Sequence, residues 1–289
     1  MLDDLSLSWS WHPGTLIILL VMSLLYVPGL RRARRRYPED ASIKVSHIAA
    51  FFAAILIAAF VLLTPVDTIA RTQLFSVHMA QAIILTTLCT PLILYGSPAI
   101  LLRPLIELPV IRTIVRLLTM PLVASVIFNL SFLLWHVPKF YEVAQQNEAL
   151  YQIEMLNIFL ASLLNWWPLI GSLREEVNRM AYPLQMLYAF FDGQPVDILA
   201  FVLVFSGVAI YKLYLIPPQL HMSAVADQTV AGALLLIPGL IDLVVMTPLF
   251  FRWLGQIEER TRLADQRRQE EAYEEEEEYE EEEEEEASK

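Results

Sequence analysis

The fold of this chain follows from apolar stretches such as residues 47–65, which read HIAAFFAAILIAAFVLLTP and contain no Asp, Glu, Lys or Arg. About 20 residues at 1.5 Å each cross the hydrocarbon core of a bilayer, so an uncharged run of roughly 18 or more predicts a transmembrane helix. Runs of this kind predict seven spans, at about residues 14–30, 47–65, 76–95, 120–137, 151–170, 183–210 and 227–252. The expected fold is therefore all-α, a polytopic membrane bundle of seven transmembrane helices.

Composition supports one membrane domain with an acidic appendage. The chain has 289 residues, of which 56% are hydrophobic, above the roughly 45–50% of soluble domains. The segment from Glu270 to Glu286 holds 14 glutamates and accounts for the net charge of −12, leaving a nearly neutral body. Such a run repels itself and buries no core, so it predicts disorder. The expected parts are an external segment at 1–13, a seven-helix domain at 14–258, and a cytoplasmic, charged, disordered tail at 259–289.

The basic residues predict the orientation. Sixteen of them lie on one side of the membrane, in the connections that follow spans one, three and five and in the segment between span seven and the acidic run. Only Arg71, Lys139 and Lys212 lie in the connections on the other side. Positive residues stay on the cytoplasmic side, so the N-terminus is expected outside and the C-terminus in the cytoplasm. Once topology explains the arginines, no basic surface for nucleic acid remains. The mixed stretch 100–118 suits a helix in the inner interface.

This topology gathers several polar and sulfur-containing residues at the external ends of the spans. They are His78, Met79, Gln81, His136, Glu154, Met155, His221, Met222 and Asp227. Imidazole with thioether suits copper, Cu⁺ especially, while carboxylates favour harder ions. We therefore predict an extracytoplasmic metal site, with His78, His136, Met155 and His221 as the expected ligands. The alternative is that these histidines are ordinary interfacial polar residues and that the methionines fill the core.

Other polar residues have readings of their own. Asp227 could orient a ligand or cap the helix of span seven. Asp192 and Asp197 in span six, and Asp242 in span seven, are carboxylates at membrane depth, which usually mark function or pair with a partner. Five residues apart on one helix, Asp192 and Asp197 are expected to point to different sides. These aspartates support an alternative function, an ion or small-solute transporter. No catalytic motif is present, and the single Cys89 excludes an intrachain disulfide.

Several segments resemble one known family. Residues 78–81 (HMAQ) with 90–98 (TPLILYGSP), 134–141 (LWHVPKFY), 165–169 (NWWPL) and 227–232 (DQTVAG) are similar to motifs of the bacterial cytochrome c oxidase assembly factor CtaG family. The similarity runs in order over about residues 15–258. Its motifs include His78, Trp135, His136, Glu154, Asp227 and Gln228. Ala82 and Met155 stand where many members carry histidine, which leaves a sparse His/Met set.

The resemblance implies a seven-helix protein of the bacterial cytoplasmic (inner) membrane. It implies a non-catalytic, chaperone-like role in the respiratory chain, in which the protein helps to mature a haem–copper oxidase by supporting its copper site. Copper is the expected cofactor, and cytochrome c oxidase subunits or copper-delivery proteins are the expected partners, with the lipid bilayer around them.

Overall fold

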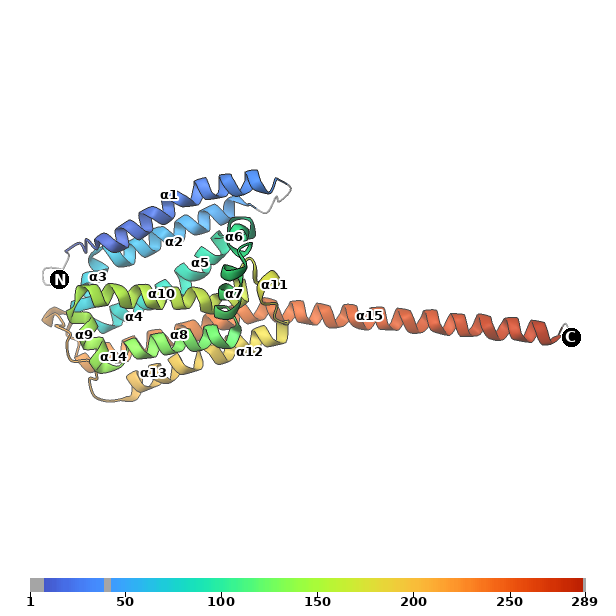
Figure 1. Cartoon of the computed structure of the whole chain (residues 1–289). Helices are drawn as coiled ribbons and strands as arrows, with labels where there is room; N and C mark the ends of the chain where they lie inside the picture. The colour runs from blue at the N-terminus through green and yellow to red at the C-terminus, as the bar shows by residue number, and fades with distance from the viewer. Residues whose placement is uncertain (1–7, 39–42, 288–289) are drawn as a thin grey trace.

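The computed structural model describes residues 8–38 and 43–287, and within these ranges it contains helices and loops but no strand. Residues 1–7 of the predicted external segment and 288–289 of the predicted tail lie outside this description. The helices form one bundle with a single long helix projecting from it (Figure 1). They are α1 Pro13–Arg36, α2 Val45–Leu63, α3 Pro65–Thr72, α4 Phe75–Ile83, α5 Thr90–Gly96, α6 Ala99–Ile106, α7 Pro109–Leu118, α8 Pro121–Trp135, α9 Pro138–Gln146, α10 Glu148–Ile170, α11 Arg174–Val177, α12 Tyr182–Asp192, α13 Gln194–Phe205, α14 Ala224–Leu235 and α15 Ile237–Ala287.

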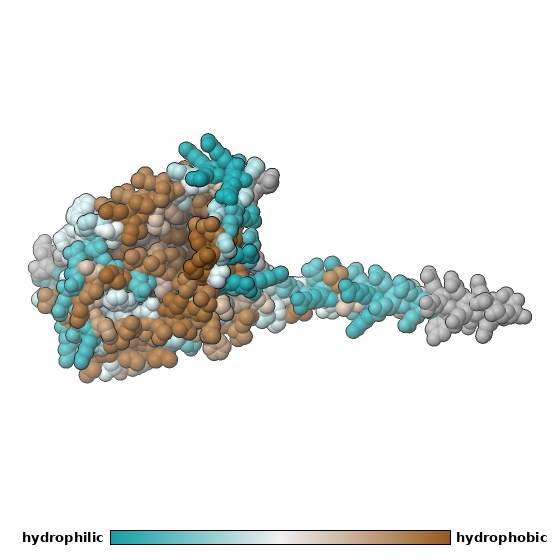
Figure 2. Space-filling view, in the orientation of Figure 1, coloured by the Kyte–Doolittle hydropathy of each residue, from teal (hydrophilic) through white to brown (hydrophobic). Residues whose placement is uncertain are grey.

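Six helical stretches of the described chain are long and apolar enough to cross a membrane. A seventh is reached if α7 and α8, which meet at a bend of 66°, count as one span. Large apolar side chains such as Leu24, Leu56 and Leu130 are exposed on the flanks of the bundle. Figure 2 shows this apolar belt between polar ends. Since water would not stabilise such a belt, the chain is a polytopic membrane protein.

The two ends of the bundle differ (Figure 1). One carries α3, α9 and the loop before α14, and is called the α3–α9 end below. The other carries α6, α7 and α11, and is called the α6–α7 end. The predicted interface helix 100–118 is divided into α6 and α7 at Glu107 and Leu108, and no residue of α7 is buried. The arginine distribution predicts that the α3–α9 end faces outside, and this orientation stays a prediction.

Three spans are interrupted where the sequence supplies a reason. Pro91 follows a π-helical turn, Ile84–Cys89, between α4 and α5. Gly193 and Pro195 separate α12 from α13, and Pro238 lies at the start of α15, just after α14 ends. Proline removes a backbone donor, so neighbouring groups must satisfy the carbonyls that it frees. These interruptions lie beside one cavity, described below.

The acidic tail forms the last part of α15. The structure continues α15 as helix through Ala287, and the described side chains of this stretch, from Glu258 to Glu275, are exposed. Figure 1 shows the helix extending away from the bundle, so packing on the rest of the chain does not hold it. Like charges four residues apart weaken a helix. Disorder of this segment in solution therefore stays a prediction.

Candidate metal centre

Three potential ligands from three helices converge inside the α3–α9 end. His78 lies in the first turn of α4, His136 is the residue at which α8 ends, and Glu154 lies two turns into α10. One ligand atom from each lies within 4.8 Å of the other two. All three side chains are at most 2% exposed. We call this cluster the His–His–Glu triad.

The ligand atoms of the triad lack partners among the described residues. Both ring nitrogens of His78, Nε2 of His136 and Oε1 of Glu154 are buried without a hydrogen bond. Nε2 of His78 lies 3.6 Å from Oε1 of Glu154. A buried polar atom without a partner costs about 1–3 kcal/mol, so four in one place call for a missing partner. Imidazole nitrogens and a carboxylate oxygen can all bind to one metal ion, which would be such a partner.

The groups around the triad orient two of its members. Nδ1 of His136 lies 2.7 Å from the carbonyl oxygen of Phe132, and a proton on Nδ1 leaves the Nε2 lone pair free for a ligand bond. Nε2 of Gln145 donates to Oε2 of Glu154 at 3.0 Å, which leaves Oε1 facing His78. The ring of Tyr141 packs against both histidine rings, with centroids 5.0 and 5.7 Å away. The ligands are therefore held before any ion arrives.

Asp227 fixes the start of α4, and hence the position of His78. Its Oδ2 accepts a hydrogen bond from the backbone N–H of Phe75 at 2.7 Å, and its Oδ1 accepts one from the N–H of Ser76 at 3.2 Å. The hydroxyl of Ser76 also donates to Oδ1. The expected cap of its own helix is wrong, because Ser223 caps α14 by accepting from the N–H of Ala226. Asp227 instead caps a different helix, across the bundle.

Gln228 and Trp135 have similar supporting contacts. Gln228 binds the loop after α13, accepting from the N–H of Ile210 at 2.7 Å and donating to Oγ of Ser206 at 2.7 Å. Nε1 of Trp135 donates to Oδ1 of Asn157 at 2.9 Å, which connects α8 to α10. Trp135 thus joins two helices that carry triad residues, whereas Gln228 joins α14 to the loop after α13.

A second buried polar network beside the triad was not expected from the sequence. Nε2 of His12 lies 2.7 Å from Oδ2 of Asp67, and its Nδ1 lies 3.0 Å from Oε1 of Glu148. Oδ1 of Asp67 accepts from the hydroxyl of Tyr151 at 2.6 Å and from Nε2 of Gln81 at 2.9 Å. Hydrogen bonding to Asp67 raises the pKa of His12 above its usual 6.5. The network fastens the segment before α1 to α3, α4 and α10.

The other expected ligands lie elsewhere. His221 is exposed, in the left-handed conformation (φ 47°), in the loop before α14, and Met222 follows it in that loop. Met155 packs in an apolar cluster with Ala58, Cys89 and Tyr151. Met79 is fully buried in another apolar cluster. Met79 and Met155 each follow a triad residue by one position, so their side chains point to a different face of the same helix. His221 and Met222 lie in a loop.

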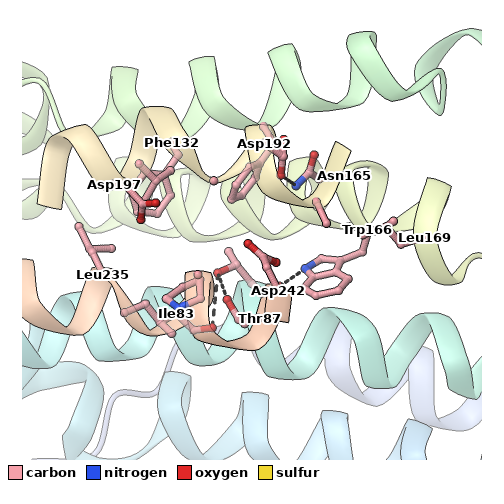
Figure 3. A pocket seen from close by; sticks show the side chains of 17 residues that line it. Ile83, Thr87, Phe132, Asn165, Trp166, Leu169, Asp192, Asp197, Leu235 and Asp242 are labelled. Atoms are coloured by element: carbon pink, nitrogen blue, oxygen red, sulfur yellow. Dashed lines mark hydrogen bonds between the residues drawn. The ribbon is translucent and has the colours of Figure 1, made fainter. Parts of the chain in front are cut away.

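The deep aspartates converge on a different site, nearer the middle of the bundle. Asp192, Asp197 and Asp242 line one cavity of about 60 Å³, together with Thr87 and Asn165 (Figure 3). Nδ2 of Asn165 donates to Oδ2 of Asp192 at 2.5 Å. Asp192 and Asp197, which were expected to point to different sides of their span, both line this cavity.

One comparison with known proteins identifies a family for the chain. The family model described as cytochrome c oxidase caa3 assembly factor (Caa3_CtaG) matches residues 24–256, a range that holds the triad and all the aspartates of the cavity. No curated protein and no solved structure matches the chain significantly. With four-fifths of its length matched, the chain belongs to the cytochrome c oxidase caa3 assembly factor family.

Proposed function

We propose that this protein supports the maturation of the copper site of its client oxidase from the extracytoplasmic face, and that the His–His–Glu triad holds copper in transit. The observation that carries the proposal is the set of buried ligand atoms without partners in His78, His136 and Glu154. The bound ion would supply no reaction of its own, since its transfer to the client is the task. The protein acts as a chaperone, not as an enzyme.

The number of ligands supports transfer over storage. Structural metal sites are usually closed by four protein ligands, whereas sites that exchange a ligand keep a position open. The triad offers three donors from three different helices, so a donor of a partner could enter as the fourth. A partner with its own copper ligands, an oxidase subunit or a copper-delivery protein, could then accept or supply the ion.

The position of the triad supports an external partner. It lies at the α3–α9 end, which the distribution of arginines predicts to face outside a bacterial cytoplasmic membrane. The ion would therefore enter and leave without crossing the bilayer. Burial of the three side chains keeps water from the ion between these events.

The test compares membranes that express the chain with His78→Ala and His136→Ala against membranes with the unchanged chain, at matched protein levels. We expect the double variant to lose both oxidase activity and the copper content of the oxidase. His221→Ala is the matched control, because it removes a histidine that is exposed and does not belong to the triad. An oxidase with full copper content in the double variant would refute the proposal.

A second candidate function, an ion or small-solute transporter, has one observation in its favour. Three aspartates from α12, α13 and α15 face the same cavity inside the membrane-spanning region. Carboxylates at this depth are typical of ion pathways. Loss of ion flux in proteoliposomes after Asp242→Asn, with oxidase assembly unchanged, is the result expected of this function. Equal flux with and without the protein would exclude it.

A further inference from the structure

We infer that the His–His–Glu triad takes copper as Cu²⁺ and not as Cu⁺. The inference rests on the proposed function, since it concerns the form of copper that the same site holds. It starts from the donor set in the structure, two imidazole nitrogens and one carboxylate oxygen. Copper differs between its two states in the donors that it prefers, so the donor set bears on the oxidation state.

The sulfur-containing side chains of this region pack among apolar residues, Met79 with Phe132 and Tyr141. Cu⁺ prefers thiolate and thioether sulfur. The thiol of Cys89 and the thioether of Met155 pack together in an apolar cluster with Ala58 and Tyr151. The exposed pair His221–Met222 lies in the loop before α14. The third ligand atom of the triad is a carboxylate oxygen, a hard donor that Cu⁺ does not prefer.

The charge of Glu154 favours the more highly charged ion. An ion inside a protein loses its hydration and is stabilised by charges of opposite sign. The carboxylate of Glu154 is fully buried, and the only hydrogen bond that it accepts from a described residue comes from the neutral amide of Gln145. The other buried carboxylates nearby are already engaged, Asp67 with His12 and Asp227 with the start of α4. Glu154 therefore offers its charge to the ion, and a doubly charged ion gains more from it.

Little movement is needed to bring the three donors onto one ion. A metal–nitrogen or metal–oxygen bond is about 2.0 Å long, so two donors on the same ion are at most about 4 Å apart. The ligand atoms of the triad lie within 4.8 Å of one another. Closing this difference takes about 1 Å or less, which side-chain rotation provides. Among divalent ions, imidazole and carboxylate donors bind Cu²⁺ most tightly, ahead of Zn²⁺.

The experiment titrates the purified full-length chain in detergent, freed of metal, with Cu²⁺, with Zn²⁺, and anaerobically with Cu⁺ against a competing chelator of known affinity. We expect one Cu²⁺ per chain, bound more tightly than Zn²⁺ and more tightly than Cu⁺. The electron paramagnetic resonance spectrum of the Cu²⁺ form should show coupling to two nitrogens. Substitution of His136→Gln should reduce this to one nitrogen.

The variant Glu154→Gln keeps the shape of the side chain and removes its charge. It should weaken Cu²⁺ binding at least about tenfold and change Cu⁺ binding much less. Glu148→Gln is the matched control on the same helix, because Glu148 is partly exposed and contacts His12. Affinity for Cu²⁺ should not change in the control. Circular dichroism of each variant checks the fold, and the His136→Gln spectrum provides the test if Glu154→Gln misfolds.

Two results overturn the inference, and they can be told apart. Tighter binding of Cu⁺ than of Cu²⁺, weakened by Met155→Leu or Met79→Leu, would refute the choice of Cu²⁺ and leave copper transit standing. Binding of neither copper ion to the unchanged chain would refute both the inference and the proposed role of the triad.

Discussion

The substitution Asp227→Ala tests whether one carboxylate holds α4 in place. Asp227 accepts from two backbone N–H groups and one hydroxyl at the start of α4, and it is buried at 2% exposure. A hydrogen bond to a charged group contributes about 1.5–3 kcal/mol, and a buried donor left without a partner is costly. Because the backbone N–H groups of Phe75 and Ser76 would both lose this acceptor, we expect the variant to lower the free energy of unfolding by about 3–5 kcal/mol. Asp227→Asn keeps one acceptor oxygen without the charge, so its loss should be smaller, about 1–3 kcal/mol.

The assay is equilibrium unfolding of the purified chain in mixed micelles, followed by circular dichroism. Ser223→Ala is the control, because it removes the cap of α14 itself, a change of about 1 kcal/mol. The expected order of destabilisation is Asp227→Ala, then Asp227→Asn, then Ser223→Ala. If Asp227→Ala is no more destabilising than Ser223→Ala, the cap across the bundle does not support α4, and the reasoning fails.

Three further predictions concern packing, pH and the tail. Gly232→Ala should destabilise the chain by about 1–3 kcal/mol, because a Cβ there would lie 2.8 Å from the carbonyl oxygen of Ala200. Gly255→Ala is the control and should leave the stability unchanged, because Gly255 has open space around it. Equal melting temperatures of the two variants would contradict this prediction. The pairing of His12 raises its pKa, so its contribution to stability is full below its unfolded pKa of about 6.5 and is lost as pH rises through the raised value. The stability difference between the unchanged chain and His12→Gln should therefore shrink as the pH rises above about 6.5, and a constant difference would count against the pairing. Amide hydrogens of residues 259–287 should exchange rapidly with deuterium, since the described side chains there are exposed, and slow exchange would reveal a bound partner.

The sequence predicts much of the fold because a bilayer imposes simple rules. Apolar length alone locates the spans, and six or seven candidate spans are present in the described chain. The short α8, Pro121–Trp135, reaches the length of a span only together with α7, to which it is joined at a bend. Helix breaks at Gly193 and Pro238 are visible as residues, but the cavity that Asp192 and Asp197 share depends on the packing of neighbouring helices, which no local pattern records.

The site was predictable in part, for a geometric reason. Topology sorts residues by membrane depth, which placed His78, His136 and Glu154 at the same end. It does not say how far each helix is rotated about its axis, so Glu154 and Met155 could not be told apart as ligands. Contacts between distant segments, such as the cap that Asp227 provides for α4, depend on tertiary packing that no local pattern records.

The link between α3 and α9 has a consequence for the lifetime of a bound ion. Nε of Arg71 donates to the backbone oxygen of Gln145 at 3.0 Å, and the side chain of the same Gln145 holds Glu154. If the buried triad holds an ion, as proposed, separation of α3 from α9 would free Gln145 and with it Glu154. The residence time of the ion would then depend on the opening rate of the protein as well as on the strength of the metal–ligand bonds. A partner that docks on α3 and α9 would shorten that time, so copper would be released where the partner is and retained elsewhere.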